Sequence, residues 1–164
     1  MKISIVPAKR LIGEVEIPGD KSISHRGIIL GAISKGDTRL NHFLMSEDCL
    51  NTIGAFKQMG IPICILDSET IVIRGKGLYG LNPPISSIDA GNSGTAARLL
   101  IGLLAGQTFH SVITGDASLQ MRPMDRIILP LQKMGAIIKS CKYEKYLPLF
   151  IQGNCLSGIE YSMP

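Results

Sequence analysis

Basic, hydroxyl-bearing and small side chains cluster at two places where the 164-residue chain is expected to start a helix. The first is Gly19-Asp20-Lys21-Ser22 and the second is Gly91-Asn92-Ser93-Gly94, each followed by an arginine seven residues after its first glycine. The free N–H groups and positive dipole end of a helix attract anions. Lysine adds a point charge and arginine a planar fork suited to phosphate or carboxylate. The candidate anion-binding residues are Lys21, Ser22, Arg26, Asn92, Gly94, Thr95 and Arg122.

Several of these side chains also have a purely structural explanation. Ser22, Asn92 and Ser93 could be helix caps, which alone would account for them. Arg98 could form either a structural salt bridge or a ligand contact. His25 is expected to be a surface or satisfied helix histidine.

Composition and charge exclude several classes of protein. Hydrophobic residues make up 45% of the chain and the mean hydropathy is +0.25, which excludes disorder. The formal charge of +4 is not gathered into a run, so neither a nucleic-acid groove nor a membrane surface is expected. The densest apolar stretch, Leu99–Gly106, is too short to span a bilayer. No secretory signal or phosphate-loop pattern is found, which favours a cytoplasmic protein that does not hydrolyse nucleotides.

The four cysteines, Cys49, Cys64, Cys141 and Cys155, form no C-x-x-C pair, and no histidine lies at metal-ligand spacing from them. We therefore expect free, mostly buried thiols in a reducing compartment, and no metal site.

Hydrophobic periodicity predicts alternating helices and strands. The helices are expected at Ser22–Ser34, Cys49–Gly60, Ala96–Leu104 and Met124–Met134. The strands are expected at Val15–Ile17, Thr38–Phe43, Ile61–Leu66, Thr70–Arg74, Ile85–Ile88, Phe109–Thr114, Ala136–Cys141, Pro148–Gln152 and Ile159–Ser162.

This order of elements repeats. Besides the two helix starts, Met59-Gly60 recurs as Met134-Gly135, and Gly75-x-x-Leu78-x-Gly80 recurs as Gly153-x-x-Leu156-x-Gly158. Ordered matches of this kind indicate stacked similar units. The predicted fold is an α/β (α+β) arrangement of β-α-β-α-β-β units, one over residues 13–84 and a second over 85–157. Residues 158–164 would begin a third unit.

Three segments carry a resemblance to a known family, the 5-enolpyruvylshikimate-3-phosphate synthases. They are Pro18-Gly19-Asp20-Lys21-Ser22-Ile23-Ser24-His25-Arg26, Gly91-Asn92-Ser93-Gly94-Thr95-Ala96-Ala97-Arg98, and Thr114-Gly115-Asp116 with Arg122-Pro123-Met124. The resemblance implies an enolpyruvyl transferase fold with two domains of three such units each. It also implies that residues 1–12 hold a strand of the partner domain, and that the chain is the N-terminal part of a longer enzyme.

The activity implied by the resemblance is transfer of the enolpyruvyl group of phosphoenolpyruvate to the 5-hydroxyl of shikimate 3-phosphate, with release of phosphate. No cofactor is implied. Lys21 would touch both substrates, Ser22 and Arg26 would bind shikimate 3-phosphate, and Gly94 and Arg122 would bind phosphoenolpyruvate. Asn92 and Thr95 would line the same site. The proton-transfer residues would belong to the other domain, so no catalytic acid or base is assigned here.

Two alternatives stay open at this point. UDP-N-acetylglucosamine enolpyruvyl transferases share the fold and chemistry, but that family has Lys-Asn where this chain has Lys21-Ser22, and a reactive loop cysteine. A non-catalytic anion-binding module could be built from the same repeats. The sequence favours a transferase of the shikimate pathway whose missing C-terminal part completes the site, so that the 164 residues alone would be inactive.

Overall fold

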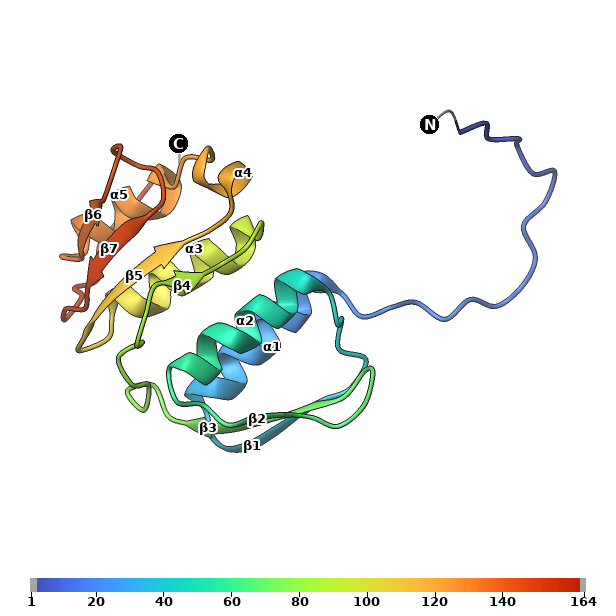
Figure 1. The fold of residues 1–164 in the computed structure, drawn as a ribbon, viewed down its shortest axis with the longest axis horizontal. Helices are drawn as coiled ribbons and strands as arrows, with labels where there is room; N and C mark the ends of the chain where they lie inside the picture. Colours follow the sequence, from blue (N-terminus) through green and yellow to red (C-terminus); the bar gives the residue numbers. More distant parts are fainter. Residues whose placement is uncertain (1–2, 163–164) are drawn as a thin grey trace.

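The computed structural model describes residues 3–162 and contains two groups of helices and strands that follow one another along the chain (Figure 1). The first group contains α1 (Lys21–Ile33), β1 (Lys35–Leu40), α2 (Glu47–Gln58), β2 (Ile63–Ile65) and β3 (Ile71–Lys76). Its three strands form an antiparallel sheet in the order β1-β3-β2.

The second group begins with a strand. It contains β4 (Ile88–Asp89), α3 (Gly94–Ala105), β5 (His110–Thr114), α4 (Ala117–Gln120), α5 (Asp125–Lys133), β6 (Ile137–Ser140) and β7 (Leu149–Gln152). Its sheet has the order β4-β5-β7-β6, in which β4 runs parallel to β5 and the other pairs are antiparallel. The predicted mixed fold is therefore confirmed, and its second group has the predicted element order with the short helix α4 added.

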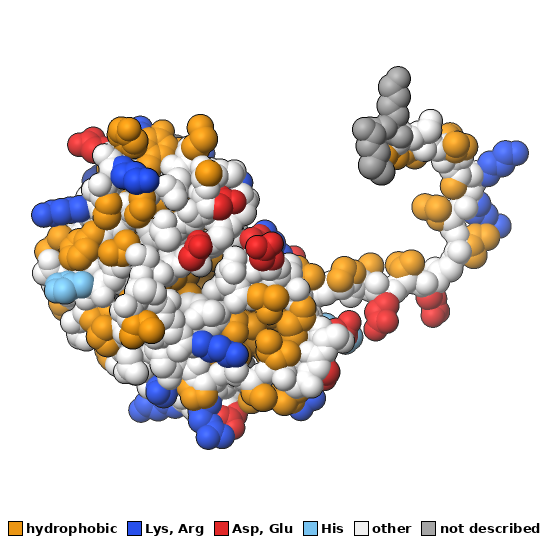
Figure 2. All heavy atoms as spheres, in the orientation of Figure 1, with side chains coloured by type: hydrophobic (Ala, Val, Ile, Leu, Met, Phe, Trp, Pro, Cys, Tyr) orange, Lys and Arg blue, Asp and Glu red, His pale blue; other side chains and the backbone are white. Residues whose placement is uncertain are grey.

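Two predicted strands are absent from the described residues. Val15–Ile17, expected to open the first unit, lies in an extended tail that pairs with no strand, and Ile159–Ser162 is likewise unpaired. Both segments have strand-like composition, but a strand needs a neighbour to accept its backbone hydrogen bonds. Figure 2 shows the tail leading away from the body with its hydrophobic side chains uncovered. Residues 1–2 of the segment expected to pair with the partner domain, and residues 163–164 of the expected third unit, lie outside the described residues.

One hydrophobic core joins the two groups. Figure 1 shows α1, α2 and α3 side by side, with the first sheet on the far side of α1 and α2 from α3. Ile28 of α1, Phe56 of α2 and Leu100, Ile101 and Leu104 of α3 have no exposed surface and belong to the same cluster. Ile28, Phe56, Leu100 and Leu104 lie at the helical spacing that the sequence predicts for buried faces, and Ile101 adds to that face of α3. The helices carrying the two motifs are therefore held against each other by packing.

The recurring Met-Gly pairs end α2 and α5 in the same way. Met59 and Met134 are the C-cap residues of α2 and α5, and Gly60 and Gly135 follow them with φ of +82° and +100°. After each glycine, the next N–H reaches back to the carbonyl of Phe56 (3.0 Å) or Leu131 (2.9 Å). This is the Schellman arrangement. It favours glycine at the position after the cap, because the backbone there is in the left-handed region.

We expect Gly135→Ala to destabilise the chain by about 1 kcal/mol. The added Cβ would meet only the carbonyl oxygen of Cys155 at 3.8 Å, so the cost is confined to the backbone. Gly102→Ala is the matched control, because Gly102 is helical and a Cβ there would enter open space. It should stabilise by up to about 1 kcal/mol. Urea unfolding measures both, and changes of the same sign would contradict the expectation.

The cysteine prediction is partly wrong. All four thiols are free, as expected, but only Cys49 is buried. Cys64 lies on the outward-facing side of the short strand β2, and Cys141 and Cys155 lie beyond the ends of β6 and β7, where both are exposed. Burial raises the pKa of the Cys49 thiol above its ordinary value. Within the described residues, no helix combines the length and apolar character needed to cross a membrane.

Candidate functional site

Three helices begin at the same side of the molecule. Figure 1 shows the N-terminal ends of α1, α2 and α3 pointing the same way. The carboxylate of Asp20 caps α1 by accepting from Ile23 N–H (2.7 Å), and the Ser93 hydroxyl caps α3 by accepting from Ala96 N–H (3.1 Å). The capping explanation therefore holds for Ser93 and is wrong for Ser22 and Asn92. Ser22 already lies inside α1, so Asp20 takes the cap, and Asn92 lies one residue before the cap of α3.

His25 connects these three helices inside the core. The imidazole has no exposed surface; its Nδ1 lies 2.9 Å from Thr52 Oγ1 on α2 and its Nε2 lies 3.2 Å from Ser93 Oγ at the start of α3. The Thr52 hydroxyl donates to the carbonyl of Asp48 (3.2 Å), so it accepts from Nδ1–H, and Nε2 then accepts from the Ser93 hydroxyl. The predicted satisfied helix histidine is confirmed, and its position makes it the link between the two motifs.

This arrangement requires a neutral imidazole. Burial lowers the pKa of His25 below its ordinary value, and the Lys21 charge lowers it further, while Asp48 opposes the shift. Thr52 could not be predicted as a partner, because the pairing depends on how α1 packs against α2.

Lys21 is the first residue of α1 and forms an ion pair with Asp48 in the first turn of α2. The Lys21 side chain is 47% exposed and that of Asp48 is 19% exposed, so the ammonium group remains open to solvent on one side. Asp48 was missed because its carboxylate has the right sign for a helix start and needs no other explanation.

A second cluster joins Asn92 to the segment after β5. Arg122 Nη2 donates to Asn92 Oδ1 (3.0 Å), and Asn92 Nδ2 donates to Asp116 Oδ2 (2.7 Å). The Asn92 hydrogen bond is the main reason that the pKa of Asp116 lies below its ordinary value, and the backbone N–H of Leu119 adds to it. All three side chains are exposed, so a ligand can reach them.

The Arg98 side chain links two segments of the protein. Its guanidinium donates to the carbonyls of Gly94 (3.3 Å) and Pro123 (3.2 Å), so it joins the start of α3 to the Arg-Pro-Met segment. These carbonyl contacts replace the predicted salt bridge. They also bring the second and third motifs together around Gly94.

The remaining predicted residues surround these clusters with different exposure. Gly94 is buried, and a Cβ there would lie 2.8 Å from Arg98 Nη1 and 3.7 Å from Arg122 Nη1, so a larger residue would displace the end of the Arg98 side chain. Thr95 is exposed in the first turn of α3, and Ser22 is half-buried in the first turn of α1. Arg26 is exposed in the second turn of α1. The site thus offers cations, hydroxyls and free helix N–H groups together, which suits a multiply charged anion.

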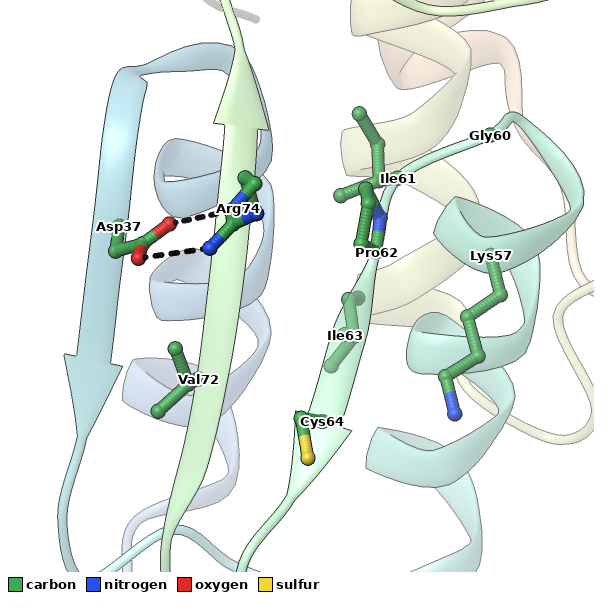
Figure 3. Close-up of a pocket in the computed structure, with 9 residues that line it drawn as sticks. All are labelled: Asp37, Lys57, Gly60, Ile61, Pro62, Ile63, Cys64, Val72 and Arg74. Atoms are coloured by element: carbon green, nitrogen blue, oxygen red, sulfur yellow. Dashed lines mark hydrogen bonds and ion pairs between the residues drawn. The ribbon is translucent and has the colours of Figure 1, made fainter.

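A separate groove of about 510 Å³ lies between the end of α2 and the strands β2 and β3 (Figure 3). It is lined mainly by apolar residues, and Arg74 is held there by Asp37, with Nε–Oδ1 at 3.0 Å and Nη2–Oδ2 at 3.4 Å. None of the seven candidate anion-binding residues lines this groove.

Comparison with known proteins gives a consistent match. The family model for EPSP synthase (3-phosphoshikimate 1-carboxyvinyltransferase) matches residues 5–164. A 3-phosphoshikimate 1-carboxyvinyltransferase from Alkaliphilus metalliredigens is 53% identical over 156 residues, covering 95% of this chain and 36% of that relative. One from Desulforudis audaxviator is 49% identical over the whole chain and 38% of its own length.

The structural match agrees with the sequence match. EPSP synthase from Acinetobacter baumannii superimposes with a TM-score of 0.86 at 47% identity, over 91% of this chain and 34% of that one. The chain therefore spans a little over a third of the length of these relatives. With its three motifs gathered at one helix-start site and a family match running from residue 5 to residue 164, the chain belongs to the EPSP synthase family.

Proposed function

We propose that this chain supplies part of the active site of a 3-phosphoshikimate 1-carboxyvinyltransferase. The enzyme would transfer the enolpyruvyl group of phosphoenolpyruvate to shikimate 3-phosphate in the cytoplasm, on the route to chorismate and the aromatic amino acids. The observation that carries the proposal is the meeting of the three motifs at the shared N-terminal ends of α1 and α3. Both substrates carry phosphate and carboxylate groups, which match the cations and helix N–H groups found there.

In this proposal the residues keep the roles that the family resemblance implies. Lys21 contacts both substrates, Ser22 and Arg26 hold shikimate 3-phosphate, and Gly94 and Arg122 hold phosphoenolpyruvate. Asn92 and Thr95 line the site between them. Fixed cations stabilise the negative charge that develops in the transition state without reorganising.

The division into units is part of the same proposal. We assign residues 13–84 and 85–157 to two successive units and residues 158–164 to the start of a third, with residues 1–12 pairing elsewhere in the longer protein. Gly75 near the end of β3 and Gly153 just after β7 support the equivalence of the two units. A Cβ on Gly75 would press on the carbonyl of Gly31 at the end of α1, and one on Gly153 would press on that of Gln107 at the end of α3.

The rival as a UDP-N-acetylglucosamine enolpyruvyl transferase has less support. Ser22 follows Lys21 where that family has asparagine, and the matched relatives carry a different name. The second alternative is a non-catalytic anion-binding module. Such a module would release no phosphate, so a measurement of turnover distinguishes it from the proposed enzyme.

The decisive experiment compares the chain alone with a completed enzyme. The completed enzyme is this chain followed by the part of the Alkaliphilus metalliredigens relative that it does not match. With both substrates present, we expect the completed enzyme to release phosphate and the chain alone to release none. Release by the chain alone would show that it holds a whole site. A completed enzyme that unfolds cooperatively but releases no phosphate would overturn the proposed function.

A smaller prediction concerns the shape of the Arg122 side chain. Arg122→Lys keeps the positive charge but loses the planar fork that can pair with two oxygens. We expect the KM for phosphoenolpyruvate of the completed enzyme to rise about tenfold, the loss of roughly one charge-assisted hydrogen bond. The fold should be unaffected because Arg122 is exposed. Calorimetric titration with unchanged phosphoenolpyruvate affinity would contradict the role given to Arg122.

A further inference from the structure

The amide of Asn92 lies between two side chains of opposite hydrogen-bonding capacity. Arg122 has only N–H donors, and an ionised Asp116 has only acceptor oxygens. The distances are 3.0 Å from Arg122 Nη2 to Asn92 Oδ1, and 2.7 Å from Asn92 Nδ2 to Asp116 Oδ2. Only one orientation of the amide satisfies both neighbours. The carboxylate at position 116 and the guanidinium of Arg122 therefore select the same orientation, with the Asn92 oxygen facing Arg122.

Asp116 also fixes the chain on either side of this contact. Its backbone N–H donates to the carbonyl of Gly91 (2.9 Å), and its second carboxylate oxygen accepts from Leu119 N–H (2.7 Å) at the start of α4. The N–H of Arg122 in turn donates to the carbonyl of Leu119 (3.0 Å). The backbone that carries Arg122 and the amide that holds its guanidinium are thus both tied to one carboxylate.

Asp116 remains ionised at neutral pH, because its pKa lies below the ordinary value of a carboxyl group. A side chain at this position that presents an NH2 group in place of the acceptor oxygen would favour the opposite orientation of the Asn92 amide, with its NH2 group toward Arg122. That orientation would place two donors together and release the guanidinium from its position beside Gly94.

We propose that Asp116 is a positioning residue that orients the Arg122 guanidinium through the Asn92 amide, and so sets the affinity of the site for the phosphate or carboxylate of phosphoenolpyruvate. The proposal rests on the proposed function for the identity of the ligand. The positioning itself does not depend on that function and can be measured separately.

The first test is kinetic and uses the completed enzyme. Asp116→Asn removes the acceptor while keeping the size of the side chain, and its amide oxygen can still accept from Leu119 N–H. We expect the KM for phosphoenolpyruvate to rise about tenfold, and the KM for shikimate 3-phosphate to change less than about twofold. Asp67→Asn is the matched control, because Asp67 accepts from Glu69 N–H (2.8 Å) in an exposed turn away from the site. It should leave both constants unchanged.

The second test uses nitrogen-15 NMR of the 164-residue chain without substrates. In the unsubstituted chain, acidification through the Asp116 pKa should shift the side-chain amide signals of Asn92. The Arg122 guanidinium signals should show restricted rotation that Asp116→Asn abolishes. The double substitution Asn92→Asp with Asp116→Asn exchanges the two side chains. The carboxylate at position 92 would then accept from both Arg122 and the amide at position 116, which should restore the restricted rotation.

The outcomes separate the two proposals. If Arg122 is equally ordered with and without the Asp116 carboxylate, the positioning role is overturned whatever the activity. Equal rises in both KM values, or in the Asp67→Asn control, would also overturn it by indicating a general loss of structure. If the unsubstituted completed enzyme shows no turnover while Arg122 still depends on Asp116 in the NMR experiment, the proposed function fails and the positioning survives.

Discussion

Lys21→Ala should lower the kcat/KM of the completed enzyme by about a thousandfold, the upper part of the range for removing one group that stabilises transition-state charge. Two effects act in the same direction. The substitution removes the ammonium at the start of α1, and it leaves the Asp48 carboxylate without its ion-pair partner at the site. A half-buried carboxylate facing two anionic substrates repels both of them.

The Asp48 contribution can be separated from that of Lys21. In the Lys21→Ala background, Asp48→Asn removes the repelling charge and should recover about tenfold in kcat/KM, equivalent to about 1.4 kcal/mol. Lys57→Ala serves as the control, since Lys57 lies in the last turn of α2 and lines the groove of Figure 3 instead. Steady-state phosphate release measures all three variants. Full turnover by Lys21→Ala would contradict the role given to Lys21.

His25→Leu should lower the free energy of unfolding by about 2–4 kcal/mol, because leaving a buried hydroxyl without its partner costs about 1–3 kcal/mol. Leucine is close in size to histidine but leaves the hydroxyls of Thr52 and Ser93 each short of one hydrogen bond. His25→Asn can still donate to Thr52 in place of Nδ1, so we expect roughly half the loss. His110→Leu is the control, since His110 is exposed on β5, and it should change stability by about 0.5 kcal/mol or less.

The same histidine predicts how stability depends on pH. Because the pKa of His25 is lower in the folded chain, the unfolded chain binds its proton first as the pH falls below about 6.5. Stability from this group is therefore complete above that pH and is lost as the pH falls toward the folded-state pKa. Urea unfolding at pH 7.5 and 5.5 should show the loss, and His25→Leu should remove this part of it. A stability that rose on acidification in the unsubstituted chain alone would contradict the neutral imidazole.

Local pattern was enough to predict much of the fold. The apolar spacing in Ala96–Leu104 predicted α3, and the recurring Met-Gly pairs predicted where α2 and α5 end. Both are short-range signals that depend on helix geometry and on the left-handed backbone of glycine. The Val15–Ile17 strand could not be judged in this way, because composition does not reveal whether a neighbouring strand is present to pair with it.

The candidate site was predictable only in part. Lys21, Asn92 and Arg122 lie in recognisable motifs, and the structure puts them at the start of α1, just before α3 and just after α4. Their partners Asp48 and Asp116 come from segments far along the chain. An acidic residue in the first turn of a helix, or at its cap, already satisfies the local rules. Only the three-dimensional packing, of α1 against α2 and of the segment after β5 against the start of α3, shows what these carboxylates contact.

The His25 link has a consequence for how the chain responds to ligands. The proposed anion site takes Lys21 from the first group of elements and Gly94 and Arg122 from the second, and the buried imidazole joins the two at their common boundary. An anion that bridges the groups binds only while they are docked. Binding of the anion therefore stabilises the docked state, by a free energy that grows with the logarithm of the ligand concentration. Such an anion would act as a folding ligand, raising the melting temperature and slowing hydrogen exchange along the α1–α3 contact.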